Sequence, residues 1–201
     1  MEKQKQKSIF DKQANQYERK REGLAQIQWR KELLSHAKGE VLELAVGAGA
    51  NFAFYPPDVR ITAADFSRAM LEKAERAAKD KHIQVDFICS DIEKMDFPGQ
   101  SYDTIVSTLS LCSYDQPFMV LDKINKWCKP AGRILLMEHG ISSNPVISII
   151  QRALDPILFR LNGCHHNRNI VELVQKSGMV IEAADSHWMN MVHLIRAKPK
   201  Q

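Results

Sequence analysis

Long apolar stretches are absent from this sequence. No run reaches about eighteen apolar residues, which is the least that a bilayer-spanning helix needs. The residues that follow Met1 are lysine, glutamate and glutamine, and they lack the apolar core of a secretory signal. We therefore expect neither a membrane-spanning helix nor a signal peptide, and we predict a cytoplasmic protein.

Cysteine is scarce, with 4 among 201 residues, and no two form a C-x-x-C pair. Cysteine adjoins histidine only at Cys164-His165-His166. Adjacent side chains rarely point at one ion, and no second ligand pair follows at a helical or C-x-x-C spacing. We therefore expect reduced thiols and no metal site.

Aromatic residues make up only 7% of the chain, and its net charge is +4. This charge is too small to indicate nucleic acid by itself, and no stripe of basic and aromatic side chains is present. The hydrophobic share of 44% and the charged share of 26% are ordinary for a globular protein. We expect one domain, with a small molecule rather than a nucleic acid as its partner.

The amino-terminal segment predicts two helices. Residues 1–9 are polar and are expected to be loose. Phe10, Ala14 and Tyr17 follow at i, i+4 and i+7, which places them on one helical face. That face either packs on the domain or covers a bound ligand, with Tyr17 supplying a hydroxyl. A second helix is expected over 24–36.

Short apolar runs alternate with helical segments across the middle of the chain. This alternation predicts right-handed βαβ crossovers and a parallel sheet. The last two runs are joined by a short link, which predicts an antiparallel edge. The fold class is therefore α/β, a doubly wound, mostly parallel seven-stranded sheet with an antiparallel edge strand. The expected strands are 40–46, 59–64, 83–89, 102–107, 133–137, 180–184 and 191–197.

One helix breaks the alternation, because the segment 145–161 is apolar almost throughout. Its composition favours either an apolar substrate pocket or contact with a membrane surface. Its few cations offer little to lipid headgroups, so we prefer the pocket. The segment 129–132, Lys-Pro-Ala-Gly, is typical of a turn. Further helices are expected at 51–55, 68–79, 118–128 and 170–177.

A predicted buried strand runs directly into a glycine turn. Gly47 and Gly49 let backbone N–H groups approach a ligand closely. The dinucleotide pattern G-x-G-x-x-G fails, because its third glycine position is Phe52. Glu43 would repel a pyrophosphate but would tolerate a ligand that carries positive charge. The turn therefore indicates a cationic nucleoside rather than NAD.

Three acids fall near the ends of three successive predicted strands: Glu43, Asp65 and Asp91. Ligands of open α/β sheets bind outside the carboxyl ends of the strands. Asp65 could there accept both ribose hydroxyls. Asp91 could accept from the exocyclic amine of adenine, with Ile92 as an apolar face for the ring. Each acid alone could equally be a helix cap or a surface residue, but their series favours a nucleoside site.

This arrangement resembles the class I methyltransferases, which use S-adenosylmethionine. Their first motif is acid-x-Gly-x-Gly-x-Gly, and the segment from Glu43 to Gly49 matches it with Ala45 in place of the first glycine. The resemblance implies S-adenosylmethionine as the cofactor. It implies cofactor contacts at Tyr17, Glu43, Ala45, Gly47, Gly49, Asn51, Asp65, Phe66, Ser67, Asp91, Ile92 and Ser107.

A narrower likeness is to the small alkyl-thiol methyltransferases of the methyltransferase-like group. It rests on segments such as Gly49-Ala50-Asn51-Phe52, Glu138-His139 and Gly163-Cys164. It implies methylation of a small, fairly apolar acceptor, with a thiol as the first candidate. A phospholipid amine, a quinone ring carbon and a non-catalytic module that only binds S-adenosylmethionine are the alternatives.

Two residues are candidates for catalysis on the acceptor side. His139 ends the fifth strand and could act as a base or be a structural histidine, whereas Arg168 could hold an anionic substrate or lie at the surface. Transfer from a sulfonium mainly needs alignment, so neither role is obligatory. Membrane contact through 145–161 and the oligomeric state stay open. The expected parts are covering helices at 1–37, a cofactor-binding core at 38–140, an apolar substrate-side cap at 141–169, and a closing helix and strands at 170–201.

Overall fold

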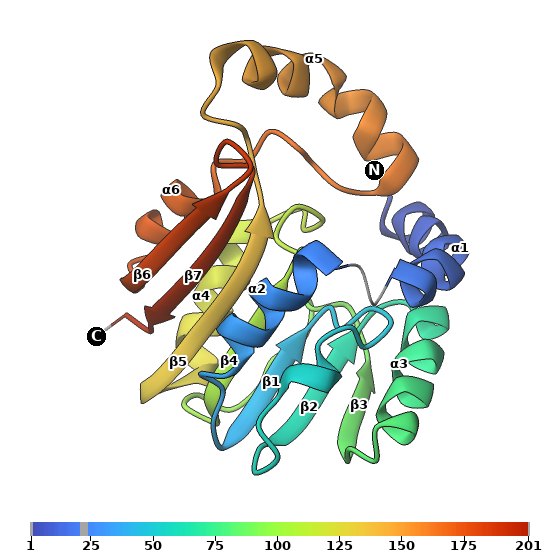
Figure 1. Ribbon diagram of the computed structural model, residues 1–201, viewed down its shortest axis with the longest axis vertical. Helices are drawn as coiled ribbons and strands as arrows, with labels where there is room; N and C mark the ends of the chain where they lie inside the picture. The colour runs from blue at the N-terminus through green and yellow to red at the C-terminus, as the bar shows by residue number, and fades with distance from the viewer. Residues whose placement is uncertain (1, 21–23, 201) are drawn as a thin grey trace.

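The computed structural model describes residues 2–20 and 24–200, and it contains a seven-stranded sheet in the order β3-β2-β1-β4-β5-β7-β6 (Figure 1). Strands β1 to β5 are parallel, and β7 runs antiparallel to both of its neighbours. The predicted fold class is confirmed. The strands are β1 (Glu40–Leu44), β2 (Arg60–Asp65), β3 (Val85–Cys89), β4 (Tyr102–Thr108), β5 (Cys128–His139), β6 (Val180–His187) and β7 (Val192–Lys198).

Helices cover both faces of the sheet, as the side-chain alternation along β1 requires. Leu42 and Leu44 join a core under α4 and α6, whereas Val41 joins a second core under α2 and α3. Figure 1 shows α2 in front of the sheet and α4 behind it. The helices are α1 (Lys3–Lys20), α2 (Leu24–Leu34), α3 (Arg68–Asp80), α4 (Pro117–Trp127), α5 (Pro145–Asn162) and α6 (Ile170–Lys176), with a short 3₁₀ turn η1 (Phe52–Phe54).

The direction of strand succession reverses at β1, whose two neighbours are β2 and β4. Crossover connections leave such a point on opposite sides, and open α/β sheets bind their ligands in the crevice at that point, here beyond the carboxyl ends of β1 and β4. The glycine turn after β1 lies at this edge. The fold therefore places the predicted ligand-binding residues where open α/β sheets bind their ligands.

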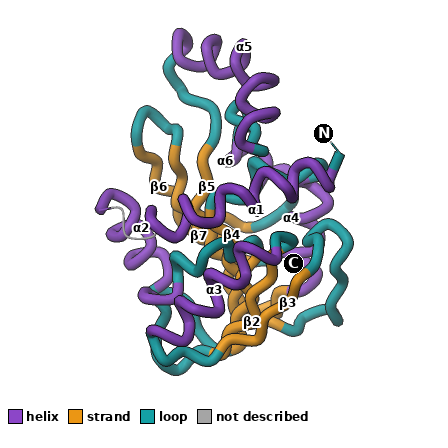
Figure 2. Tube along the Cα trace, turned by 90° about the vertical axis from the view of Figure 1, so that its right-hand side faces the viewer, coloured by secondary structure: helices purple, strands orange, loops and turns teal. Residues whose placement is uncertain are grey.

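The expectation of a loose segment over 1–9 is wrong, because α1 begins at Lys3. Gln6 is only 1% exposed, and its amide donates to the backbone oxygens of Ser113 and Gly163. Polar residues are ordered here by long-range hydrogen bonds, which composition does not reveal. Figure 2 shows α1 running between α3 and α5.

Several element boundaries also differ from expectation: β3 begins at Val85, β6 runs on to His187, and α2 ends at Leu34, while two further differences have a clear local cause. Strand β1 ends at Leu44, before the expected Val46, because Ala45 turns into the left-handed region with φ 52°. The predicted turn at 129–132 lies inside β5, which begins at Cys128. The pairing of β4 with β5 shifts register there, so the extra residues form an irregularity within the strand rather than a separate turn.

Helix α5 stands apart from the sheet, beyond the ends of β5 and β7 (Figure 1). Asn144 caps its first turn, and Gly163 ends it in the left-handed region with φ 80°. Within the described residues, none of the helices combines the length and the apolar character needed to cross a membrane. Residues 1, 21–23 and 201, which the expected parts include, lie outside the described residues. The large apolar side chains that α5 exposes are Val146, Ile149, Ile150, Leu154, Ile157 and Leu161.

Candidate active site

The glycine turn after β1 is a tight loop in the left-handed region. Ala45, Gly47 and Gly49 have φ of 52°, 56° and 78°, so Ala45 adopts a conformation that favours glycine. A Cβ placed on Gly47 would lie 3.9 Å from Cδ1 of Tyr17, so the Tyr17 ring lies over the turn. The structure thus brings together the turn and the covering tyrosine that the sequence predicted.

Asp65 ends β2 and holds this turn in place. Its Oδ2 accepts from the backbone N–H of Gly47 at 2.9 Å, and its Oδ1 accepts from that of Ser67 at 2.8 Å. Burial raises the pKa of Asp65 to about 6, although these hydrogen bonds act in the opposite direction. The backbone N–H of Phe66 also faces this carboxylate, and its two oxygens carry four lone pairs, so acceptor capacity remains for the ribose. Asp65 therefore fits the ribose role proposed for it.

Asp91 and Ile92 follow the end of β3. One carboxylate oxygen of Asp91 accepts from the backbone N–H of Glu93 at 3.1 Å, and the other can still accept from a ligand. Ile92 is buried in the core on the α4 side of the sheet. The strand end thus supplies a carboxylate beside an apolar side chain, which suits adenine, and the adenine contact itself stays a prediction.

Glu43 lies beneath the turn rather than at its surface. Its two oxygens accept from the Asn51 side-chain amide and the Tyr55 hydroxyl, each at 2.8 Å. Burial raises the pKa of Glu43 to about 7, while these hydrogen bonds and the guanidinium of Arg30 lower it. Arg30 also donates to Asn51 and, at 3.3 Å, to Thr108. In this structure Glu43 and Asn51 support the loop, and their contact with cofactor stays a prediction.

Sequence reasoning missed Arg30, although a signal was present. Within α2, Arg30 lies on the same face as Ile27, Leu34 and the following Ala37, at i+3 and i+4 spacings. A cation inside an apolar stripe needs a buried partner, and Glu43 is an acid inside an apolar strand. The sequence could therefore have predicted that Arg30 and Glu43 lie close together.

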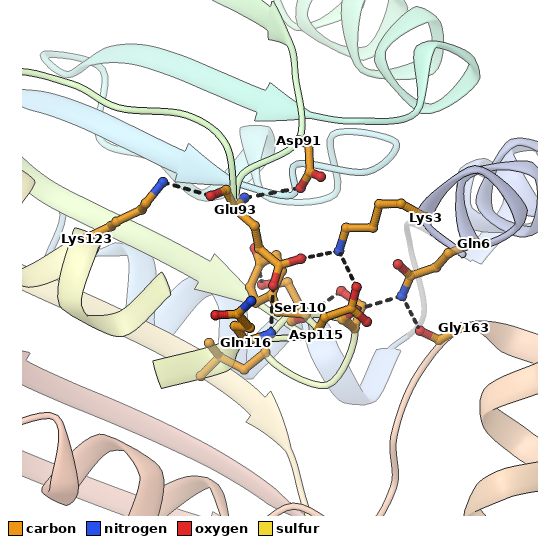
Figure 3. Close-up of polar contacts among 12 residues, drawn as sticks. Lys3, Gln6, Asp91, Glu93, Ser110, Asp115, Gln116, Lys123 and Gly163 are labelled. Atoms are coloured by element: carbon orange, nitrogen blue, oxygen red, sulfur yellow. Dashed lines mark hydrogen bonds and ion pairs between the residues drawn. The ribbon is translucent and has the colours of Figure 1, made fainter. Parts of the chain in front are cut away.

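Helix α1 connects the two sides of the crevice. Lys3 forms an ion pair with Glu93, and Gln6 reaches Ser113 at 2.7 Å and Gly163 at 3.0 Å (Figure 3). Farther along the helix, Phe10 packs against Phe66, with ring centroids 5.6 Å apart. The helix therefore contacts the loops after β2, β3 and β4 and the end of α5.

Ser67 is the N-cap of α3. Its hydroxyl oxygen accepts from the backbone N–H of Met70, and its hydroxyl lies at hydrogen-bond distance from the Asp11 carboxylate of α1. It therefore positions α1 and α3 together. Contact of Ser67 and of Phe66 with the cofactor stays a prediction.

Ser107 belongs to a buried polar cluster at the end of β4. Its hydroxyl donates to Glu138 at 2.6 Å, and the backbone N–H groups of Ser110 and Leu111 donate to the same carboxylate at 2.8 and 3.1 Å. Burial raises the pKa of Glu138 to about 7, against the effect of these hydrogen bonds and of nearby His139. Sequence reasoning missed Glu138 as the group that holds the loop after β4, since its partners lie far away in sequence.

Arg168 is half-buried, and its guanidinium is engaged by backbone. It donates to the oxygen of Leu111 and, at 2.6 Å, to that of Tyr114. Its charge also lies near the thiols of Cys112 and Cys164. In this structure Arg168 positions the loop after β4, and its predicted contact with substrate stays a prediction.

His139 meets two cysteines at the acceptor side. The ligand-type atoms of Cys112, His139 and Cys164 all lie within 4.8 Å of one another. The pKa of the Cys164 thiol is lowered, because the Cys112 thiol donates to it and His139 and the charge of Arg168 favour the thiolate. The pKa of the Cys112 thiol is correspondingly raised. No spacing in the sequence predicts this cluster, because its members lie on three separate segments.

His165 and His166 point elsewhere, as the argument against a Cys164-His165-His166 ion site requires. His165 Nδ1 lies 2.8 Å from an Asp155 carboxylate oxygen, and the backbone N–H of His166 donates to the other at 2.6 Å. The His166 ring stacks on His139, with centroids 4.8 Å apart. His166 therefore packs against the His139 ring, and Asp155 holds both His165 and His166 in place.

Comparison with known proteins gives the family of the central segment. Residues 41–132 match the model of the family described as a methyltransferase domain. The thiol S-methyltransferase TMT1B of Rattus norvegicus is 34% identical over 143 residues, which are 68% of this chain and 58% of that protein. A phosphatidylethanolamine N-methyltransferase of Cereibacter sphaeroides is 25% identical over 58% of each chain. A demethylmenaquinone methyltransferase of Clavibacter sepedonicus is 31% identical over 57% of this chain and 46% of its own length.

The chain thus spans about half the length of the curated relatives that it matches. Among solved structures, the S-adenosylmethionine dependent methyltransferase from Mesorhizobium loti superposes with a TM-score of 0.68 and is 16% identical, over 89% of this chain and 99% of that one. The [4+2]-cyclase SpnF superposes with a TM-score of 0.69 at 14% identity, over 87% of this chain and 80% of that one. At such identities the superpositions establish the fold alone, and the reaction has to be argued from the site.

Proposed function

Since this chain carries the domain and the fold of the class I methyltransferases, we propose that it transfers a methyl group from S-adenosylmethionine to a small, fairly apolar thiol. The cofactor half of the site is the glycine turn with Asp65 and Asp91. The acceptor half is the pair of loops after β4 and α5 together with the end of β5.

The observation that carries this proposal is the environment of Cys164. The hydrogen bond from the Cys112 thiol, then His139 and the charge of Arg168, lower the pKa of that buried thiol, so the acceptor half favours a thiolate over a thiol. A thiolate is the nucleophilic form of sulfur. The same environment would favour the thiolate of a bound acceptor. The thiol S-methyltransferase relative supports the same acceptor atom.

The residues of the cofactor half have separate tasks in this proposal. Asp65 would accept the ribose hydroxyls, Asp91 would accept from the adenine amine, and Tyr17 would cover the turn at Gly47. Bound S-adenosylmethionine supplies a methyl group that is already activated on its sulfur. The protein's contribution is then alignment and the exclusion of water, which α1 provides by lying across the crevice.

The first test has a binding arm and a transfer arm. Calorimetric titration with S-adenosylmethionine and, separately, with NAD should show binding of the first alone. Mass spectrometry should then find methylated product from ethanethiol and none from phosphatidylethanolamine or a demethylated menaquinol. Failure of a folded sample to bind S-adenosylmethionine would refute the proposal.

The transfer arm separates the alternatives. Methylation of the amine or of the quinol ring instead would establish the nitrogen or carbon reaction, for which the two other relatives are precedents. Tight binding without transfer to any acceptor would favour a non-catalytic module that only binds the cofactor.

We further propose that the exposed face of α5 contacts a lipid surface from the cytoplasmic side. Ile149 and Leu161 are 66% and 68% exposed, and Arg152 and Arg160 on the same helix can approach acidic headgroups. Exposed Trp188 follows β6 at the same end of the molecule. This contact replaces the pocket as our preferred role for the segment, because these side chains face outward.

Co-sedimentation with phosphatidylcholine vesicles that contain phosphatidylglycerol tests this surface. Binding should be lost when Ile149 and Leu161 are both changed to Ser, and kept when exposed Val180 is changed to Ser. If the protein instead forms a concentration-dependent dimer and does not bind vesicles, the partner of the exposed α5 face is a second copy of the chain. The free state of all four cysteines agrees with a cytoplasmic location, which stays part of the proposal.

A further inference from the structure

Three side chains of metal-binding type converge at the acceptor half from segments that are far apart in sequence. Cys112 lies in the loop after β4, His139 is the last residue of β5, and Cys164 follows the end of α5. Their Sγ, imidazole nitrogen and Sγ atoms all lie within 4.8 Å of one another. Both thiols are buried, and neither forms a disulfide.

The size of this triangle suits a tetrahedral ion. Tetrahedral Zn–S and Zn–N bonds of about 2.3 and 2.0 Å place their ligand atoms about 3.5 to 3.8 Å apart. The three atoms therefore need to move by roughly an ångström at most to bind one ion. Two thiolates and an imidazole are ligands that zinc prefers, whereas magnesium and calcium prefer oxygen.

The surrounding contacts hold the three segments together. The backbone N–H of His165 donates to the oxygen of Cys112 at 2.9 Å, which links the two cysteine loops directly. Gln6 of α1 donates to the residues beside each cysteine, Ser113 and Gly163. Ion sites need such support, because it fixes the ligands in position before the ion binds.

We infer that Cys112, His139 and Cys164 form a zinc site with three protein ligands and an open fourth position. Three ligands plus one exchangeable position is the pattern of reactive rather than structural zinc sites. Burial, and then the nearby charges of Cys164 and Cys112, raise the pKa of the Tyr17 hydroxyl, so the cluster lies near the tyrosine that covers the glycine turn. The open position is therefore assigned to that side.

The fourth position would take the sulfur of the acceptor, and this part rests on the proposed function. A zinc-bound water leaves, a Zn–S bond forms, and the thiol proton passes to solvent. The product of this exchange is a zinc-bound thiolate, which is the nucleophile of the proposed transfer. No oxidant or reductant is required.

Zinc content tests the site without reference to activity. Reduced protein, stripped with a chelator and then dialysed against limiting Zn²⁺, should retain about one zinc per chain by elemental analysis. Cys112→Ser, Cys164→Ser and His139→Gln should each lower the affinity about a hundredfold or more, because even a change to a group that only hydrogen-bonds a ligand costs about 10- to 100-fold. Cys89→Ser, at an exposed cysteine outside the cluster, should retain the ion. A folded, fully reduced protein that binds no zinc would overturn the inference.

Cobalt substitution tests the open position. Co²⁺ in the site should show thiolate-to-metal absorption, and ethanethiol should shift this absorption whereas ethanol should not. An unshifted spectrum would overturn the role of the fourth position and leave the ion site standing. Calorimetry with S-adenosylmethionine on the same samples separates failure of the proposed function from failure of the zinc site.

Discussion

The two halves of the crevice are built in different ways. In the cofactor half, Asp65 and Asp91 each come at or just after the end of a strand, and the glycine turn follows the strand between β2 and β4. In the acceptor half, Cys112, His139 and Cys164 come from a loop, a strand end and the residue after a helix C-cap. The first half repeats one local arrangement along adjacent strands, and the second depends on long-range packing.

This difference explains how one fold can serve many acceptors. The parallel strands themselves bring the residues of the cofactor half together, so any chain with this sheet can keep them. The acceptor half uses connections that vary without changing the sheet. Specificity for the acceptor should therefore respond to changes in the loops after β4 and α5, and affinity for the cofactor should not.

The largest effect is expected from the buried cation beneath the cofactor half. Arg30→Met removes the hydrogen bonds that the buried guanidinium donates to Asn51 and Thr108 beneath the turn, and two hydrogen bonds from a charged donor are worth about 3–5 kcal/mol of unfolding free energy together. Urea unfolding measures this loss. Arg60→Met removes a largely exposed partner of Glu40 and should cost less than about 1 kcal/mol. Equal stability of the two variants would show that the turn does not depend on Arg30.

The second-largest effect is expected from Asp65→Ala, which should weaken the binding of S-adenosylmethionine to the cofactor half. Two hydrogen bonds to a charged carboxylate are worth about 3 kcal/mol together, which is roughly a hundredfold in the dissociation constant. Calorimetry with S-adenosylmethionine measures this change, and circular dichroism checks the fold. Asp86→Ala, at an exposed acid of β3, is the matched control. Unchanged affinity in a folded Asp65→Ala protein would remove Asp65 from the site.

Glu138 gives the acceptor half a pH dependence. Its pKa of about 7 in the folded protein lies above the ordinary value of 4.5. Between pH 4.5 and pH 7, the carboxyl is therefore protonated in the folded protein and ionised in the unfolded chain. The associated stability is present below about pH 4.5 and is lost as pH rises through 7. The glutamine in Glu138→Gln does not titrate. The unfolding free energy of this variant should therefore fall by about 2 kcal/mol less between pH 5 and pH 8 than that of the unsubstituted protein.

Urea titrations at the two pH values measure the difference. Glu182→Gln, which removes an exposed partner of Lys198, should leave the fall unchanged. An unaltered pH profile in Glu138→Gln would mean that Glu138 stays ionised in the folded protein.

The smallest effect is expected at Ala45. Its φ of 52° costs about 1–2 kcal/mol for a residue with a Cβ. Glycine avoids this cost, but it loses about 0.5–1 kcal/mol more conformational entropy on folding than alanine does. Ala45→Gly should therefore stabilise the protein by about 0.5–1 kcal/mol and keep cofactor affinity within about twofold. Thermal unfolding measures the gain. Ala48→Gly in the same turn lacks the positive φ and should destabilise instead.

The predictions from sequence were strongest where structure is local. The strand segments, the glycine turn and the position of Asp65 at a strand end all depend on residues within a few positions of one another. Sequence reasoning failed at residues 1–9, where Gln6 is ordered by partners more than a hundred positions away. It also gave no indication that Cys112, His139 and Cys164 lie together, because no periodic pattern connects Cys112 with Cys164.

By itself, the sequence determined the α/β class, the seven strands and the series of acids around a glycine turn, because alternation and turn chemistry act over a few residues. Only the tertiary structure decided that Arg30 supports Glu43, that α1 lies across the crevice, and that two thiols meet His139. Such contacts form when distant segments pack on the same edge of the sheet, and their pairing is set by the packed core rather than by any local pattern.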